Sequence, residues 1–195
     1  MSEENDEYRE ETDLIGARRI PIDALYGVQS LRAKENFGVS MDSLYKYTTL
    51  IQSLAMVKKA CALANRKLDH LSEEYAKAII QACDEIIGGE FHDAFIVDML
   101  QGGAGTSTNM NLNEVIAARA NEILGHPRNS QSPIDANDHV NMSQSTNDVY
   151  PTGIKIATIF SLRDLALSLR VLIVALDEKA DKFMDTLKLG RTEMQ

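Results

Sequence analysis

The sequence has few of the residues that build disulfide-linked or metal-bound proteins. It contains only two cysteines, and Cys61 and Cys83 both lie beside small or apolar residues in segments with helical periodicity. We therefore expect two reduced structural thiols in a cytoplasmic protein rather than a disulfide. The spacing typical of metal ligands is also absent among the four histidines, which are His70, His92, His126 and His139.

Long apolar runs and an excess of basic residues are missing as well. No run reaches the roughly 20 apolar residues that span a bilayer. The acidic start, Met1–Glu11, has no apolar core of a signal peptide. The formal net charge is -9 at pH 7, which argues against nucleic acid or a membrane as the main partner. The net charge does not argue against a small dicarboxylate as a ligand, because a local site can be positive in an acidic protein.

The apolar pattern predicts a mainly α-helical protein with short extended segments near its start. We interpret residues 1–12 as a flexible acidic tail and residues 14–38 as turn-rich chain with short strands around Ile20 and residues 26–28. Residues 126–138 are expected to form a loop. Apolar side chains that recur every three to four residues predict four helices, at residues 42–67, 73–87, 109–124 and 153–189.

The last predicted helix is unusually long. Residues 154–189 contain neither proline nor glycine, and about thirty helical residues extend roughly 45 Å. Such a helix usually packs in a bundle with other long helices, and the sequence predicts no second helix of that length. We therefore expect its partners beyond residue 195, in other subunits, or both. The expected domains are an N-terminal helical domain at 13–140 and the start of a helical bundle at 141–195.

Two stretches of small polar residues each lie at the start of a predicted helix. One is Ser143-Gln-Ser-Thr-Asn-Asp148, and the other is Thr106-Ser-Thr-Asn-Met-Asn-Leu-Asn113, which follows a glycine-rich break. Such residues are common in turns, helix caps and polar packing. They also suit an anion site, because free N–H groups and small donors at a helix start can hold a carboxylate. The repeated pattern favours binding for Thr106, Ser145, Thr146 and Asn147. Both interpretations stay open for Asn109, Asn111, Asn113 and Asp148.

The same stretches carry a family resemblance. Gly103–Ala117 and His139–Thr152 resemble two signature regions of the aspartase/class II fumarase superfamily. Leu14–Gly27 and Arg32–Phe37 resemble its N-terminal region, and Gly190-Arg-Thr192 resembles a short element that follows its first long bundle helix. The resemblance implies an N-terminal helical domain followed by that helix, within a homotetramer that assembles through the central helices. Family members are more than twice as long, so we expect an N-terminal fragment.

Sequence details favour the aspartase branch of this superfamily. Thr106-Ser-Thr-Asn109 and Ser145-Thr-Asn147 are similar to aspartases, whereas fumarases usually carry Gln after the first Thr and Ser-Ser-Asn in the second motif. The fumarase turn His-Pro-Asn-Asp, a second dicarboxylate site, reads Asp135-Ala-Asn-Asp138 here. Two alternatives stay open. One is a class II fumarase or another fumarate-forming lyase, and the other is a non-catalytic helical oligomerisation fragment.

The resemblance implies a reaction and a set of contacts. The expected reaction eliminates ammonia from L-aspartate to give fumarate through an aci-carboxylate intermediate, without a metal or an organic cofactor. By this resemblance, Thr106, Ser145 and Thr146 hold the β-carboxylate. Asn147 contacts the amino group, with Thr106 and Thr146 nearby, and Thr192 contacts the α-carboxylate.

Two departures from the family pattern concern catalysis. Glu193 occupies a position that is usually His or Gln in the family. A carboxylate there can pair with the substrate ammonium but repels the substrate carboxylates. The family's mobile loop with the catalytic serine does not occur in these 195 residues, so the fragment is expected to be inactive alone.

Overall fold

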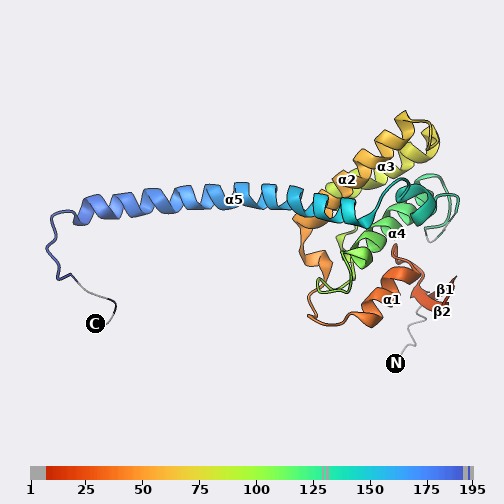
Figure 1. The fold of residues 1–195 in the computed structure, drawn as a ribbon, viewed down its shortest axis with the longest axis horizontal. Helices are drawn as coiled ribbons and strands as arrows, with labels where there is room; N and C mark the ends of the chain where they lie inside the picture. Colours follow the sequence, from red (N-terminus) through yellow and green to blue (C-terminus); the bar gives the residue numbers. More distant parts are fainter. Residues whose placement is uncertain (1–7, 129, 131, 191–192, 194–195) are drawn as a thin grey trace, which may run out of the picture. The chain divides into compact units, whose positions relative to one another are not determined.

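The computed structural model describes residues 8–128, 130, 132–190 and 193. The described chain is mainly helical with one two-stranded sheet (Figure 1), which confirms the predicted fold class. The chain divides into two compact units, residues 1–157 and residues 158–195. The domain boundary that the sequence places near residue 140 stays a prediction.

The N-terminal segment forms a hairpin. Strand β1 (Tyr8–Asp13) pairs antiparallel with strand β2 (Gly16–Pro21), so that Tyr8 faces Pro21 and Asp13 faces Gly16. The expected flexible tail is therefore wrong for residues 8–12. Besides the strand pairing, the Arg9 guanidinium donates hydrogen bonds of 2.8–2.9 Å to the carbonyls of Pro21, Ala24 and Tyr26.

Helix α1 (Val28–Asn36) replaces the second strand that the sequence predicted near residues 26–28. Its N-cap, Gly27, offers no side chain for capping. The Glu114 carboxylate instead accepts hydrogen bonds from the backbone N–H groups of Gly27, Gln29 and Ser30 at 2.9–3.1 Å. Helix N-termini need such acceptors. Here the acceptor lies far along the chain, so the local sequence contains no start signal.

Three helices form the body of the first unit, with a common apolar core (Figure 1). Helix α2 (Thr48–Lys67) packs against α3 (Glu73–Ile87), which packs against α4 (Thr106–Ile123). The prediction for α3 is confirmed, since the Ser72 hydroxyl accepts a hydrogen bond from Tyr75 N at 3.2 Å and Gly88 ends the helix. Fully buried core side chains include Leu54, Ile79, Ile86, Leu112 and Ile116.

The helix starts differ from the predictions where tertiary contacts intervene. Helix α2 begins at Thr48 rather than near residue 42, and a short 3-10 helix, η1 (Leu44–Lys46), precedes it. The backbone N–H groups of Leu44 and Tyr45 donate to carbonyls at residues 97 and 95, which holds this segment away from a regular α-helix. A second 3-10 helix, η2 (His92–Ala94), lies in the connection to α4.

The predicted loop at residues 126–138 contains more order than expected. Its end forms a π-helical turn, η3 (Ala136–Val140), which the Asp135 carboxylate caps by accepting from the N–H groups of Asn137 and Asp138. The buried Asn121 side chain of α4 ties the loop down. Its amide donates to the Ser130 and Ile134 carbonyls and accepts from Ile134 N, at 2.8–2.9 Å.

Helix α5 runs from Thr146 to Phe183, rather than from Gly153 to Leu189 as predicted. Pro151 lies inside it. Packing within the first unit explains the early start, because Val149 and Gly153 are buried there. An added Cβ atom at Gly153 would lie 2.4 Å from Leu54 Cδ2, so only glycine allows this close approach of α5 to α2.

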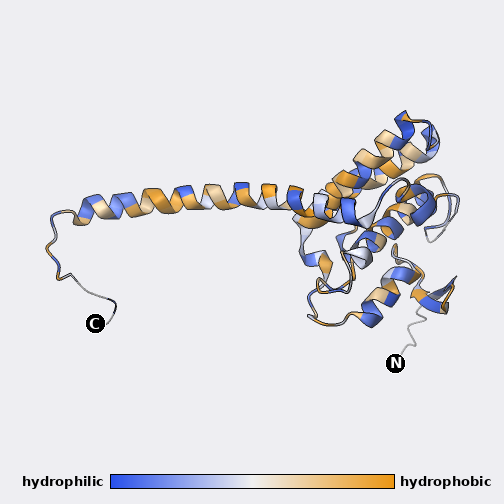
Figure 2. Ribbon diagram, viewed as in Figure 1, coloured by the Kyte–Doolittle hydropathy of each residue, from blue (hydrophilic) through white to orange (hydrophobic). Residues whose placement is uncertain are grey.

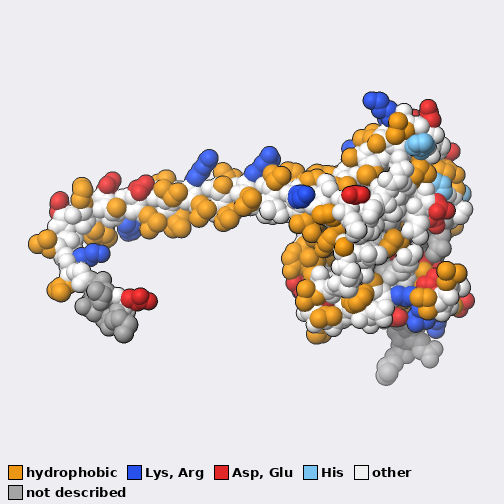
Figure 3. All heavy atoms as spheres, viewed as in Figure 1, with side chains coloured by type: hydrophobic (Ala, Val, Ile, Leu, Met, Phe, Trp, Pro, Cys, Tyr) orange, Lys and Arg blue, Asp and Glu red, His pale blue; other side chains and the backbone are white. Residues whose placement is uncertain are grey.

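The second unit consists of the remainder of α5 and the chain that follows it. Apolar residues recur along this part of the helix (Figure 2), and their side chains lie at the surface (Figure 3). Leu165, Leu172 and Leu176 are each more than half exposed. Packing of these side chains in a bundle stays a prediction. In the described residues, no helix combines the length and apolar character required to cross a membrane.

Candidate functional site

The two polar stretches of the sequence lie together at the starts of α4 and α5. Thr106 is the first residue of α4 and Thr146 is the first residue of α5. The Ser145 hydroxyl caps α5 by accepting from Asn147 N at 3.2 Å. Gly105 permits the approach of the two starts, since an added Cβ atom there would lie 2.3 Å from the Tyr150 ring.

Asn109 joins the two helices by hydrogen bonds. Its Nδ2 atom donates to Thr146 Oγ1 at 3.1 Å and to Asn141 Oδ1 at 3.0 Å. Because the Thr146 oxygen accepts this bond, the Thr146 O–H remains available as a donor to a ligand. Thr146 is half-buried, which keeps its hydroxyl at the boundary between the asparagine network and solvent.

The other predicted site residues of the first unit are accessible. Thr106, Ser145 and Asn147 are exposed. Asn147 also lines an open hollow, together with Tyr150, Pro151 and the segment 99–105. The positive ends of two helix dipoles and several small donors thus meet at one place, an arrangement that suits a carboxylate.

Two further predicted site residues belong to the second unit of the chain. Thr192 lies outside the described residues. Glu193 is exposed and belongs to the second unit. Their contribution to the site therefore remains a prediction.

A buried lysine lies behind the helix starts. Lys58 of α2 is 1% exposed, and its Nζ atom donates to Asn141 Oδ1 at 3.0 Å and to Gln144 Oε1 at 2.9 Å. Asn113 Nδ2 donates to the same Asn141 oxygen at 3.2 Å. Burial lowers the pKa of Lys58 to about 8, so the ammonium form still predominates at neutral pH.

For the asparagines of α4, the sequence left open whether they bind a ligand or serve in capping and packing. The structure separates their roles. Asn111 is a packing residue, since its side chain bonds Ile96 N and the Ala94 carbonyl. Asn109 and Asn113 belong to the network with Lys58. Among the described residues, their Oδ1 atoms are buried without a hydrogen-bond partner.

Sequence reasoning missed Lys58, Asn141 and Gln144 as parts of this network. A signal for Lys58 was present, because it lies at a position of α2 where the apolar spacing expects a buried side chain. A lysine at such a position requires polar partners from elsewhere in the fold. Nothing in the local sequence identifies those partners.

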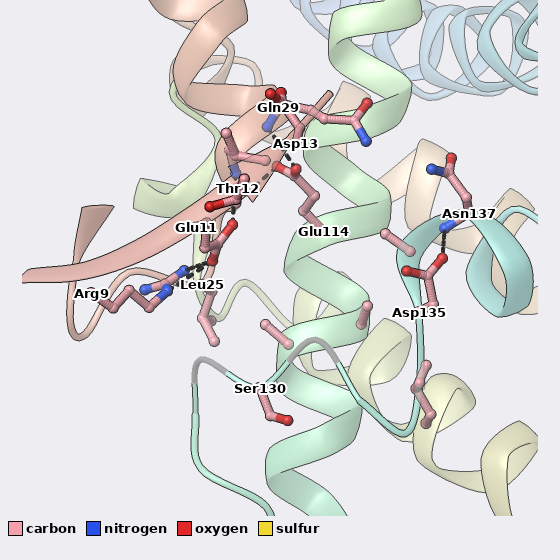
Figure 4. Close-up of a pocket in the computed structure, with 16 residues that line it drawn as sticks. Arg9, Glu11, Thr12, Asp13, Leu25, Gln29, Glu114, Ser130, Asp135 and Asn137 are labelled. Carbon is pink, nitrogen blue, oxygen red and sulfur yellow. Dashed lines mark hydrogen bonds and ion pairs between the residues drawn. The ribbon is translucent and has the colours of Figure 1, made fainter. Parts of the chain in front are cut away.

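A partly open pocket of about 140 Å³ lies elsewhere in the first unit (Figure 4). Its lining comes from β1, Leu25, the start of α1, helix α4, Ser130 and residues 134–137. Glu11, Asp13, Glu114 and Asp135 all line it, and Figure 4 shows Glu11 and Glu114 on one side and Asp135 on the other. Glu11 and Glu114 both cap helix α1. An acidic lining of this kind disfavours a dicarboxylate.

The sequence and fold are similar to those of known lyases. A family model described as "Lyase" matches residues 16–195. Aspartate ammonia-lyase from Helicobacter pylori strain J99 is 49% identical over 187 residues, which cover 96% of this chain and 40% of that protein. The chain thus spans about two fifths of the length of this curated relative.

Solved structures agree with this similarity. The structure titled fumarate lyase:delta crystallin from Brucella melitensis, in native form, superimposes with a TM-score of 0.92 at 51% identity. The match covers 97% of this chain and 44% of that one. Class II fumarase from Schistosoma mansoni gives a TM-score of 0.87 at 36% identity, covering 97% of this chain and 40% of the fumarase.

Proposed function

Because the chain belongs to the lyase family whose model matches residues 16–195, we propose that the full-length protein converts L-aspartate to fumarate and ammonia. The relatives named aspartate ammonia-lyase support this choice of substrate. The observation that carries the proposal is the meeting of the α4 and α5 N-termini. Asn109 fixes the Thr146 oxygen there and leaves the hydroxyl hydrogen for a substrate carboxylate.

In the proposed reaction, this site stabilises the negative charge that develops on the substrate. A base takes a proton from Cβ, and the electron pair of that C–H bond moves into the β-carboxylate to form an aci-carboxylate dianion. The double bond then forms as the Cα–N bond breaks and ammonia leaves. Thr106, Ser145 and Thr146 bind the β-carboxylate. Donors that face such developing charge typically contribute a few kcal/mol each.

The remaining contacts of the proposal follow the family pattern. Asn147 contacts the amino group, and Thr192 contacts the α-carboxylate. Glu193 directly follows Thr192 in sequence. Its carboxylate attracts the substrate ammonium and repels the substrate carboxylates. We propose a cytoplasmic homotetramer that assembles through the central helices, with the base serine supplied by chain outside this sequence. A fragment limited to these residues is then inactive.

A class II fumarase is the second candidate, favoured by the structural match to the Schistosoma mansoni enzyme. The two are separated by the ultraviolet absorbance of fumarate, with full-length protein and either L-aspartate or L-malate as substrate. We expect faster turnover of L-aspartate. Faster turnover of L-malate would contradict the proposal in favour of fumarase. No fumarate from either substrate would support a non-catalytic oligomerisation module.

A further inference from the structure

The buried ammonium of Lys58 lacks the partner that a buried charge usually has. The lysine is 1% exposed, and its bonds at Nζ go to two neutral amide oxygens. Among the described residues, no ion pair involves Lys58. An unpaired buried charge is costly, and an apolar side chain of similar volume stabilises a core better. Stability alone therefore does not account for a lysine at this position.

The position of Lys58 in the hydrogen-bond network suggests what it does. Asn141 Oδ1 accepts from three donors, namely Lys58 Nζ, Asn109 Nδ2 and Asn113 Nδ2, at 3.0–3.2 Å. This convergence fixes the Asn141 oxygen toward α4. It also fixes the Asn109 amide, because only its Nδ2 side can donate to Asn141 and to Thr146 together.

The orientation of the Asn109 amide decides the role of the Thr146 hydroxyl. With Nδ2 facing Thr146, the Thr146 oxygen accepts and its hydrogen points to another acceptor. With the amide reversed, Asn109 Oδ1 would take that hydrogen, and the donor to a ligand would be lost. A strong donor to the Asn141 oxygen, such as the Lys58 ammonium, therefore keeps the Thr146 hydroxyl free to donate to a ligand.

We propose that Lys58 is a positioning residue for the site, acting through Asn141 and Asn109 to keep the Thr146 hydroxyl aimed as a donor at a substrate carboxylate. This inference rests on the proposed function. Lys58 does not touch the substrate in this arrangement.

The test compares Lys58→Met with Lys59→Met in the full-length protein. Lys59 is the adjacent residue on α2, and its ammonium pairs with Asp84 at the surface of α3. We expect Lys58→Met to lower kcat for L-aspartate by about 10- to 100-fold with a smaller change in KM, since the aimed donor acts on charge that develops during the reaction. Lys59→Met should keep the kcat of the parent protein.

A double variant separates positioning from general damage to the fold. If Lys58 acts through Thr146, then Lys58→Met should lower kcat by less than about threefold in a Thr146→Val background. Equal losses in both backgrounds would overturn the inference, as would an unchanged kcat in Lys58→Met alone. A parent protein that forms no fumarate would instead contradict the proposed function.

Asn109→Asp provides an independent variant if Lys58→Met does not fold. The aspartate has the shape of asparagine but no N–H donor, so it accepts from the Thr146 hydroxyl and reverses that hydrogen bond. A fall in kcat comparable to that of Thr146→Val supports the inference. A folded Asn109→Asp protein with parental kcat would overturn it.

Discussion

Gly105→Ala perturbs the meeting point of the two helix starts, and the structure indicates how much it should cost. Gly105 has φ of +88°, a left-handed conformation that costs an L-residue about 1–2 kcal/mol. The new Cβ atom would lie 2.3 Å from Cγ and Cδ1 of Tyr150, so the ring must move. Overpacking of this kind typically costs about 1–3 kcal/mol. The expected loss of unfolding free energy is therefore about 2–5 kcal/mol.

Gly103→Ala is the matched control for this substitution. Gly103 has nearly the same φ, +86°, but an added Cβ atom would contact only Thr106 Oγ1 at 3.7 Å, an ordinary distance. Urea denaturation of both full-length variants should show a smaller loss for Gly103→Ala, of about 1–2 kcal/mol. Fumarate formation should also fall further in Gly105→Ala. Equal stability losses in the two variants would refute the claim that Tyr150 packs against Gly105.

Two further predictions concern charged groups. Glu193→Gln removes a negative charge at a proposed substrate-contact position, so KM for L-aspartate should fall by about threefold or more in steady-state kinetics; an unchanged KM would remove Glu193 from the site. Burial lowers the pKa of Lys58 from 10.5 to about 8, so the unfolded chain binds more protons between these values. Unfolding free energy should therefore rise with pH in that window, relative to Lys58→Met, by at most ~1.4 kcal/mol per pH unit. Cys61 and Cys83 are the titratable groups that interact with Lys58, and burial raises the pKa of both thiols. Both thiols are present in the two proteins that are compared. The prediction would be contradicted if the unfolding free energies of the two proteins, measured by urea denaturation, changed equally with pH across this window.

Elements with local signals were predictable from sequence, and elements held by distant residues were not. Helix α3 has its own cap at Ser72 and its own stop at Gly88, so both ends were predicted correctly. Helix α1 depends on the Glu114 carboxylate, which reaches Gly27 from 87 residues away. The sequence predicts a tail where β1 forms, because the stabilising contacts of this strand also come from later in the chain.

The candidate site divides in the same way. Small polar residues at two predicted helix starts pointed to Thr106 and Thr146 as candidates, and the two signature motifs led to the correct family. The network behind them was not predicted, because Lys58, Asn109 and Asn141 come from three separate segments of the chain. These side chains come together only where α2 and α4 both meet the chain that leads into α5.

The central claim is that the Thr146 hydroxyl donates to a substrate carboxylate, and its most direct test is kcat/KM for L-aspartate in full-length Thr146→Val. Thr152→Val is the matched control, because Thr152 is exposed on the same helix and its hydroxyl bonds the Asp148 carbonyl at 2.6 Å. We predict a loss of about 100- to 1000-fold for Thr146→Val and nearly parental activity for Thr152→Val. A Thr146→Val protein within about twofold of the parent would contradict this account of the site.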